Sequence, residues 1–520
     1  MFLKALTLLY IFCFHTLPGI APAIDVQHYK YDIELTDASD AITGKATIRV
    51  TFLAGSSQLL LQLASLDGEK GMLAYAVTEG GKKLQVAHRN NELLIYLSQA
   101  AKTGEVRSFE ISYMGVPDDG LIISKNKFGD RTFFADNWPN RAHRWLPCND
   151  VPGDKASVEF IVTAPAVYKV ISNGLLLEEK FINGGRKRTH WKEDLPIPTK
   201  VMVIGAARFA VKEVDSAYAV PVTAWLYPQD SAKGFHDYSL ADDILRFFET
   251  YIGPYPYKKL ANVQSTTMFG GMENASAIFY GEKTVTGTRS SEALMAHEIV
   301  HQWFGNTATE KSFAHLWLSE GFATYLTNMY VEHRHGRDSL VQRLQNERAQ
   351  VIDFAQKWPQ PVVDSISGFM ELLNANSYQK GGWVLHMLRT EAGDSVFKKI
   401  IQNYYKRYQW ANADTRDFQK VAEEVSGKNL DVFFNQWLYR PGIPQLNVQT
   451  KLEKGSVRVT VTQTGSLFTF PLEVEVLRSD GSSQLHTIAV SQKETVFLMD
   501  VPGAKKIVID PQTKLLFARK

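Results

Sequence analysis

The chain has 520 residues, which is too long for a single hydrophobic core, so we expect two to four domains. A hydrophobic content of 45% and a charged content of 22% are ordinary for a globular protein. The formal net charge of +2 is close to balance, and it therefore argues against a nucleic-acid partner.

The N-terminus has the pattern of a secretory signal peptide over residues 1–23. A lysine-containing start, Met1–Lys4, precedes the apolar run Ala5–Leu17 and the small-residue site Ala21–Ala23. This run of 13 residues is shorter than the ~20 that span a bilayer, so we expect no stable membrane span after cleavage. Cleavage would leave Cys148 as the single cysteine. We therefore expect an exported protein, periplasmic or extracellular, without an internal disulfide.

Strand patterns dominate residues 24–209. The runs Tyr29–Leu35 and Ala46–Phe52 alternate apolar and polar residues, and clusters of glycine and serine separate such runs. The composition of Val201–Gly205 predicts one more strand. We interpret this region as a β-rich N-terminal domain.

Helical patterns replace the strands over residues 210–441. In Leu240–Tyr251 the apolar residues share one helical face, and glycine and proline follow directly. Beyond residue 441 strand patterns return, for example in Val457–Val461 and Leu472–Val476, and predict a small β-sandwich over 442–520. The expected fold class is therefore multidomain α+β.

The helical region contains the run His297-Glu298-Ile-Val-His301. On a helix the two histidines lie one turn apart on the same face, where they can hold one metal ion, with Glu298 beside it as a base. Glu320 follows eighteen residues after His301, within an apolar stripe at helical spacing. A carboxylate buried there without a partner would cost several kcal/mol, and a cation removes that cost. We expect Glu320 to be the third ligand of a zinc ion whose fourth position is open.

The pattern His-Glu-x-x-His alone also occurs by chance on surface helices. Here it combines with the glutamate at an eighteen-residue spacing and with a preceding segment that consists of Gly270, Gly271, Met272, Glu273 and Asn274. Together these motifs resemble the aminopeptidase N family of gluzincin zinc metallopeptidases, which also contains leukotriene hydrolase.

The resemblance implies a β-saddle N-terminal domain over 24–209, a thermolysin-like zinc peptidase domain over 210–441 and a small β-sandwich over 442–520. Many relatives continue into a large helical C-terminal domain that covers the active site. We expect no such domain in this chain. The cleft should then be more open, unless a second subunit covers it; the sequence makes no prediction of oligomeric state.

The resemblance also implies a function and roles for individual residues. We expect an aminopeptidase with one Zn²⁺ per chain, acting on peptides with a free N-terminus. The segment 270–274 would align the substrate, and Glu273 would bind its α-amine, which is mostly protonated at neutral pH. Tyr378, in a Tyr-x-Lys-Gly stretch, would donate a hydrogen bond to the oxyanion. Spacing alone does not distinguish Tyr378 from a packing tyrosine.

The sequence departs from the family in the aromatic segment 133–150. Family members carry a Gln or Glu there that helps to bind the substrate's amino terminus, and the corresponding position here is Trp138. Asp136 or Asn137 could take over this polar contact, or Trp138 could line the pocket. A third interpretation is that Trp138 and Trp145 pack an interface between domains.

Three other functions compete with the aminopeptidase. One is epoxide hydrolysis like that of leukotriene hydrolase, and another is thermolysin-type endopeptidase action, which has no need for Glu273. The third is a catalytically silent peptide-binding or scaffold protein. Loss of Glu298, Glu320 or Tyr378 would indicate the third, and all of these residues are present.

Overall fold

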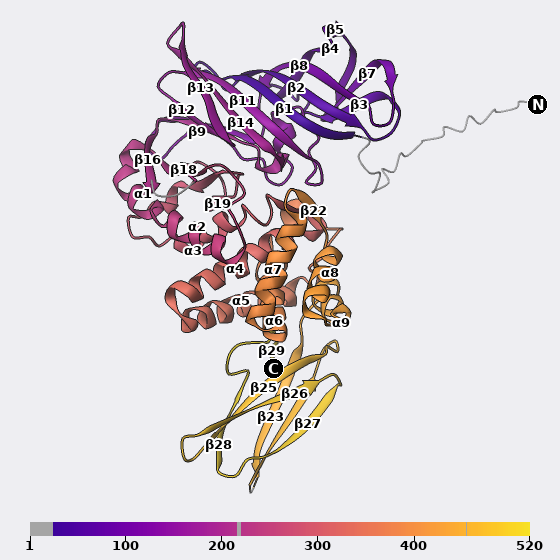
Figure 1. Ribbon diagram of the computed structural model, residues 1–520, viewed down its shortest axis with the longest axis vertical. Coiled ribbons are helices and arrows are strands. Elements are labelled where there is room, and N and C mark those ends of the chain that lie inside the picture. The colour runs from indigo at the N-terminus through magenta and orange to yellow at the C-terminus, as the bar shows by residue number, and fades with distance from the viewer. Residues whose placement is uncertain (1–23, 216–219, 454) are drawn as a thin grey trace, which may run out of the picture.

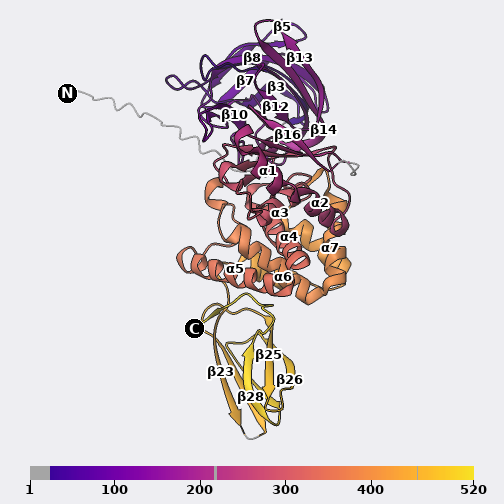
Figure 2. The same cartoon turned by 90° about the vertical axis from the view of Figure 1, so that its left-hand side faces the viewer.

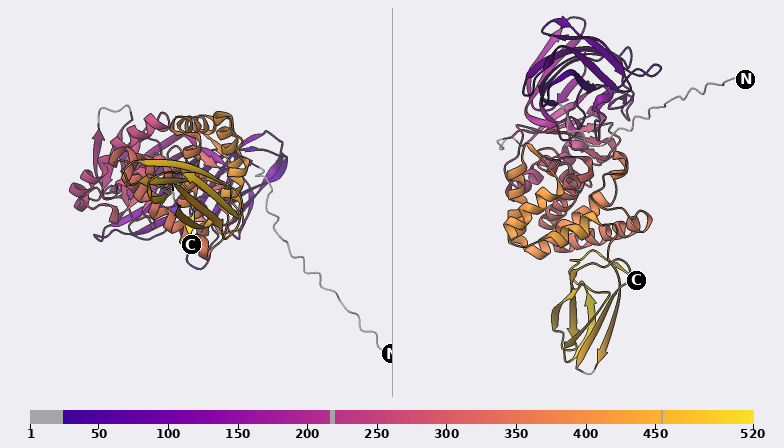
Figure 3. Two further views of the ribbon diagram at one scale, coloured as in Figure 1. Left: turned by 90° about the horizontal axis from the view of Figure 1, so that it is seen from below. Right: turned by 90° about the vertical axis from the view of Figure 1, so that its right-hand side faces the viewer.

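The computed structural model describes residues 24–215, 220–453 and 455–520, so the predicted signal peptide, residues 1–23, lies outside the described part. The described chain forms a row of a β-rich part, a helical part and a β-sandwich along its longest axis (Figure 1, Figure 2). Figure 3 shows the chain from below, along the row, and from its right-hand side. Within the described residues, every helix is too short or too polar to cross a bilayer.

The N-terminal part is built from three β-sheets. The largest has eight strands in the order β13 (Leu175–Ile182), β14 (Arg186–Pro198), β11 (Lys155–Pro165), β1 (Ile24–Glu34), β2 (Ile42–Phe52), β8 (Val106–Val116), β4 (Gly71–Glu79) and β5 (Lys82–Lys83). A second sheet has the order β12 (Lys169–Ser172), β15 (Ile204–Ala207), β10 (Arg131–Ala135) and β9 (Leu121–Lys125). The third consists of β3 (Ser56–Gln62), β7 (Glu92–Ala101) and β6 (Gln85–Arg89). In β1 the alternating Tyr29, Tyr31 and Ile33 are buried, so the predicted strand period is confirmed.

The predicted strand Val201–Gly205 is wrong in its first half. Residues Thr199–Val201 form the 3₁₀ turn η2, and β15 (Ile204–Ala207) begins only after it. The buried side-chain amides of Asn137 and Asn173 donate hydrogen bonds of 2.5 to 3.2 Å to carbonyls between residues 199 and 202. These bonds satisfy the backbone locally, so the segment needs no neighbouring strand.

The helical part begins with a five-stranded sheet of order β16 (Ala210–Asp215), β17 (Val222–Leu226), β18 (Leu260–Ser265), β20 (Ala277–Gly281) and β19 (Gly271–Met272), and includes the pair β21 (Ala308–Glu310) and β22 (Ala411–Ala413). Its helices are α1 (Ser231–Tyr238), α2 (Leu240–Tyr251), α3 (Glu292–Val300), α4 (Trp317–His335), α5 (Arg337–Lys357), α6 (Gly381–Ala392), α7 (Asp394–Tyr408), α8 (Thr415–Ser426) and α9 (Asp431–Phe434). The short 3₁₀ turns of this part are η3 (Pro228–Asp230), η4 (Glu282–Thr284), η5 (Phe313–His315) and η6 (Phe369–Leu372), and one more, η1 (Ala142–Arg144), lies in the β-rich part. Two further turns are π-helical, η7 (Asn376–Lys380) and η8 (Asn435–Tyr439).

Helix α4 is the centre of this part, because every side chain from Trp317 to Val331 is buried. It crosses α6 at two glycines. A Cβ on Gly321 would lie 2.9 Å from the backbone of Gly381, closer than real Cβ contacts, so only glycine permits this approach. The crossing brings the turn η7, just before α6, against the first turns of α4.

The C-terminal sandwich packs one sheet, of order β27 (Glu494–Asp500), β24 (Ser456–Gln463), β23 (Gln445–Glu453) and β29 (Ala518–Arg519), against a second. The second sheet has the order β26 (Ser483–Val490), β25 (Phe470–Arg478) and β28 (Ala504–Ile509). Alternate valines of β24 and β25 are buried between them, as expected for a sandwich core. Arg348 of α5 anchors the sandwich through an ion pair of 2.5 Å with Asp510.

A buried ion pair joins the N-terminal part to the helical part, and it generates the first prediction. Lys200 Nζ lies 2.5 Å from Glu310 Oε1, and both side chains are at most 1% exposed. Replacing Lys200 by methionine leaves a buried carboxylate uncompensated, so we expect K200M to lose about 3–5 kcal/mol of unfolding free energy. Urea denaturation followed by tryptophan fluorescence measures this loss.

The control is K311M, because Lys311 makes exposed pairs with Asp414 and Asp417. We expect this variant to lose less than about 1 kcal/mol. Equal losses in the two variants would contradict the proposed dependence on the buried pair.

Candidate active site

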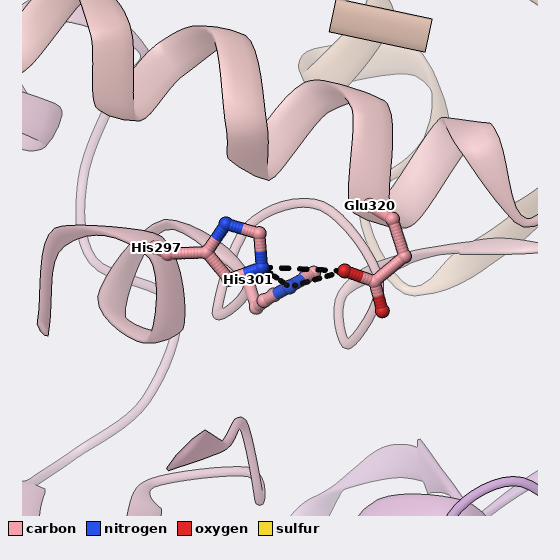
Figure 4. Close-up of side chains that lie close together, drawn as sticks. All are labelled: His297, His301 and Glu320. Carbon is pink, nitrogen blue, oxygen red and sulfur yellow. Dashed lines mark hydrogen bonds and ion pairs between the residues drawn. The ribbon is translucent and has the colours of Figure 1, made fainter. Parts of the chain in front are cut away.

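Three side chains from α3, its C-terminal end and α4 meet at one buried point (Figure 4). Glu320 Oε2 lies 3.2 Å from His297 Nε2 and 3.3 Å from His301 Nε2. The two Nε2 atoms are 3.1 Å apart. His297 is in the last turn of α3, His301 caps that helix, and Glu320 is in the first turn of α4.

The tautomer of His301 follows from its neighbour. Its Nδ1 lies 3.0 Å from the carbonyl oxygen of Phe304, which can only accept, so Nδ1 carries the proton in the neutral ring. Its Nε2 then presents a lone pair to the Glu320 carboxylate and to His297. Gly305, at φ 111°, lets the chain turn here, since a Cβ would lie 2.3 Å from Ser319 Oγ.

Facing acceptor atoms repel one another, so this point requires a cation. Two imidazole nitrogens and one carboxylate oxygen are the donor set of catalytic zinc sites, and the three residues present fit such an ion. If protons alone supply the positive charge, the pKa values of His301 and Glu320 show the same requirement. Burial disfavours the charged imidazolium, but attraction to Glu320 raises the pKa of His301 to about 10. Burial also opposes ionisation of Glu320, yet both histidines hold its pKa well below its usual range.

Glu298 follows His297 on α3 and is 4% exposed. Burial, together with the nearby charges of Glu273 and Glu320, raises its pKa well above the usual value. The edge strand β19 passes directly over it. A Cβ on Gly271 would lie 2.4 Å from Glu298 Oε1, so glycine is required for this approach.

The segment after β19 buries a carboxylate with an unused oxygen. Glu273 is 5% exposed, and its Oε1 has no hydrogen-bond partner among the described residues. The backbone is fixed, because the Glu273 carbonyl accepts hydrogen bonds from Gln302 at 2.8 Å and Asn306 at 2.6 Å. A fixed, buried acceptor of this kind is suited to a cationic group.

Tyr378 lies on the turn η7 beside this cluster. Its ring stacks on the His297 ring with 6.0 Å between the centroids. Burial first, and then the charges of Glu320, Glu273 and Glu298, raise the pKa of Tyr378 well above its usual value. The phenol therefore keeps its proton at neutral pH and is available as a donor.

A cavity of about 530 Å³ joins these groups. Nine of the ten predicted site residues line it, namely Gly270, Gly271, Met272, Glu273, His297, Glu298, His301, Glu320 and Tyr378. The tenth, Asn274, is fully buried behind the lining.

Trp138 lines the cavity, whereas Asp136 and Asn137 do not. The Trp138 ring packs edge-on against Phe269 and Phe313, with centroid distances of 6.2 and 5.9 Å. Asp136 pairs instead with Arg141, and Asn137 holds the turn η2. The structure thus places an aromatic wall where the resemblance led us to consider a polar contact.

Another part of the lining was missed by sequence reasoning. It comprises Thr324 and Thr327 of α4, Arg343, Asn346, Glu347 and Gln350 of α5, and Leu373. The α5 residues share one helical face, which is a visible signal, but a polar helix face ordinarily predicts solvent exposure. Only the packing of α5 on α4 reveals that this face borders a cavity.

Two protein-family models match the chain. The model of the "Peptidase M1 N-terminal domain" matches residues 25–201, and that of the "Peptidase family M1 domain" matches residues 237–437. The fold resembles a crystal structure of Legionella pneumophila aminopeptidase A in complex with aspartic acid, with a TM-score of 0.85 and 17% identity. That match covers 97% of this chain and 60% of the other.

Two relatives illustrate the likeness in sequence. Aminopeptidase M1-A of Oryza sativa subsp. japonica is 26% identical over 475 residues, covering 86% of this chain and 53% of the relative. Glutamyl aminopeptidase of Sus scrofa is 27% identical over 457 residues, covering 82% and 48%. The chain therefore spans about half the length of these relatives.

Glu347, in the cavity lining, is expected to make the stability of the protein depend on pH. Burial is the main cause that raises the pKa of Glu347 to about 7. The folded state therefore disfavours the carboxylate. Relative to E347Q, the wild type should lose stability as pH rises from about 4.5 to 7, with no further loss above. The shift corresponds to about 3 kcal/mol.

Urea midpoints of both proteins between pH 4.5 and 8 measure this difference. Midpoints that stay parallel over the whole range would contradict a raised pKa of Glu347.

Proposed function

Because the chain belongs to peptidase family M1, we propose that it is a zinc-dependent aminopeptidase that removes single residues from the free N-terminus of peptides. The observation that carries this proposal is the meeting of His297, His301 and Glu320 in a cavity that also holds Glu273. This combination supplies a metal site and, beside it, a buried carboxylate with a free oxygen.

One Zn²⁺ per chain would be held by His297, His301 and Glu320. When bound, zinc supplies Lewis acidity toward the scissile carbonyl and lowers the pKa of a water molecule to about 7. The hydrogen bond from His301 Nδ1 to Phe304 fixes the ring so that Nε2 faces Glu320 and His297, where it would be available to the metal.

The remaining roles fall to groups around this point. Glu298 would accept the proton of the attacking water and pass it to the leaving amine. Tyr378, which keeps its proton, would donate a hydrogen bond to the oxyanion.

The backbone of Gly270 and Gly271 would align the substrate, with Met272 and Asn274 supporting that edge. Glu273 would bind the protonated α-amine, and this contact limits cleavage to one residue.

We further propose that residues 1–23 are a signal peptide and that the protein is exported to the periplasm or the medium. The lysine-containing start, the apolar run and the small-residue site support this. The domain boundaries 24–209, 210–441 and 442–520 also stay predictions.

The first test separates an active metallopeptidase from a silent scaffold. We expect chelation to abolish cleavage of leucine p-nitroanilide and added zinc to restore it. E298Q should retain zinc but lose about 10²- to 10⁴-fold in kcat/KM, the usual contribution of a general base. Zinc content by atomic absorption and steady-state kinetics measure both effects.

The control is E424Q, an exposed glutamate on α8 that should leave the rate unchanged. Bound zinc without turnover of any peptide in the wild type would support the scaffold and contradict the enzyme.

The second test concerns the amine. We expect cleavage of Leu-Ala-Ala but not of its N-acetylated form, because Glu273 pairs with a charged amine. E273Q should lower kcat/KM for the free peptide by roughly 10- to 100-fold, the size of a charge-assisted hydrogen bond. Mass spectrometry of the products gives both rates. Equal cleavage of acetylated or internal bonds would indicate an endopeptidase and would contradict the role of Glu273.

A further inference from the structure

A cluster of polar side chains from α4 and α5 occupies the part of the cavity that the mechanism does not use. Asn328 is at its centre: its Oδ1 accepts a hydrogen bond of 2.6 Å from Arg343 Nε, and its Nδ2 donates to both oxygens of Glu347 at 2.9 Å. Arg343 and Glu347 line the cavity, and Thr327 lies beside them.

The cluster contains donor groups that have no acceptor. Each oxygen of Glu347 accepts a hydrogen bond from Asn328, and the Glu347 side chain is only 8% exposed. Arg343, by contrast, is 34% exposed, and its Nη1 and Nη2 have no hydrogen-bond acceptor within the described chain. Its Nη2 forms an ion pair with Glu347 at 3.9 Å, a distance too long for a hydrogen bond. Thr327 Oγ1 is buried and likewise without a partner among the described residues.

The positive charge of Arg343 favours the same kind of ligand, one that accepts hydrogen bonds and carries negative charge. Arg343 is the only lysine or arginine among the described residues that line the cavity. A guanidinium with free Nη groups matches the two oxygens of a carboxylate, which it can bind in a bidentate manner. A cationic ligand would be repelled by Arg343, and the neighbouring carboxylate of Glu347 already pairs with Arg343 and accepts hydrogen bonds from Asn328.

The position of the cluster assigns it to the leaving side of the scissile bond. The Glu273 carbonyl accepts hydrogen bonds from Gln302 and Asn306, beyond the C-terminal end of α3. The N-terminal end of α3 lies instead near the C-terminal end of α4, because Tyr330 donates a hydrogen bond to Glu292. The path along α4 from Glu320, in its first turn, therefore leads away from Glu273. Thr327 is seven residues further along α4, or about 10 Å at 1.5 Å per residue. An extended peptide covers this distance with about three residues. The substrate would therefore run from its amine at Glu273, past the metal, toward Arg343.

We propose that Arg343 binds a carboxylate in the leaving part of the peptide, two or three residues beyond the cleaved bond. This inference rests on the proposed aminopeptidase function and adds a substrate preference to it. The carboxylate is either the C-terminal group of a short peptide or an acidic side chain in a longer one. The enzyme thus favours tripeptides and tetrapeptides with a free C-terminus, or peptides acidic near their third residue.

Paired substrates in the full chain test this preference. One arm compares Leu-Ala-Ala and Leu-Ala-Ala-Ala with their C-terminal amides, and the other compares Leu-Ala-Glu-Ala amide with Leu-Ala-Gln-Ala amide. We expect the wild type to prefer the carboxylate member of at least one arm by roughly tenfold, mainly in KM. The arm that responds identifies the source of the carboxylate.

Variants then locate the preference. R343Q should bring the ratio of kcat/KM within the responding pair to about one, and R343K should retain part of it because the charge remains. The ratio is taken within each variant, so a general loss of folding or activity cancels. R334Q, an exposed arginine on α4 outside the cavity lining, should keep the wild-type ratio.

Two outcomes would overturn the inference. Ratios near one for every pair in the wild type would mean that no carboxylate is recognised, and a preference retained in R343Q would assign it to another group. Absence of cleavage of every free-amine peptide would overturn the proposed function itself, and the inference with it.

Discussion

The meeting of three acceptor atoms at one buried point is the constraint on which the rest of the structure depends. Two imidazole nitrogens and a carboxylate oxygen within about 3 Å of one another are unstable unless a cation lies between them. The surroundings hold these atoms together: the carbonyl of Phe304 orients His301, and the glycine crossing at Gly321 seats α4. The fold therefore creates a demand for positive charge at this point, which a proton on His301 or a metal ion meets.

The same cavity gathers several carboxylates, since Glu273, Glu298, Glu320 and Glu347 all line it. Burial alone would drive these groups toward their neutral forms, as the raised pKa values of Glu298 and Glu347 show. Under the proposed function, a divalent ion at one point and Arg343 at another would offset this charge. The two proposals thus assign separate places in the cavity to an amine, a metal and an anion.

Local patterns made part of this arrangement predictable. The His-Glu-x-x-His spacing places two candidate ligands on one helical face, because the helix period depends only on neighbouring residues. Helix α2 has the bounds that its apolar face predicted. The strand period likewise predicted the sandwich core. The turn at Thr199–Val201 was missed because the amides of Asn137 and Asn173, distant in sequence, hold its backbone. The cluster around Arg343 was missed for the same reason, since α5 shows no motif and acquires its role only by packing on α4.

The wall formed by Trp138 has a consequence for how this protein can diversify. Trp138 comes from the β-rich part, yet it packs against Phe313, which lies just before the helix that carries Glu320. Lys200 and Glu310 join the same two parts a few residues away. The β-rich part therefore forms one side of the cavity as well as packing on the helical part. Recombination that exchanged this part between relatives would change one wall of the cavity and leave His297, His301 and Glu320 in place. We therefore expect the two parts to be inherited together.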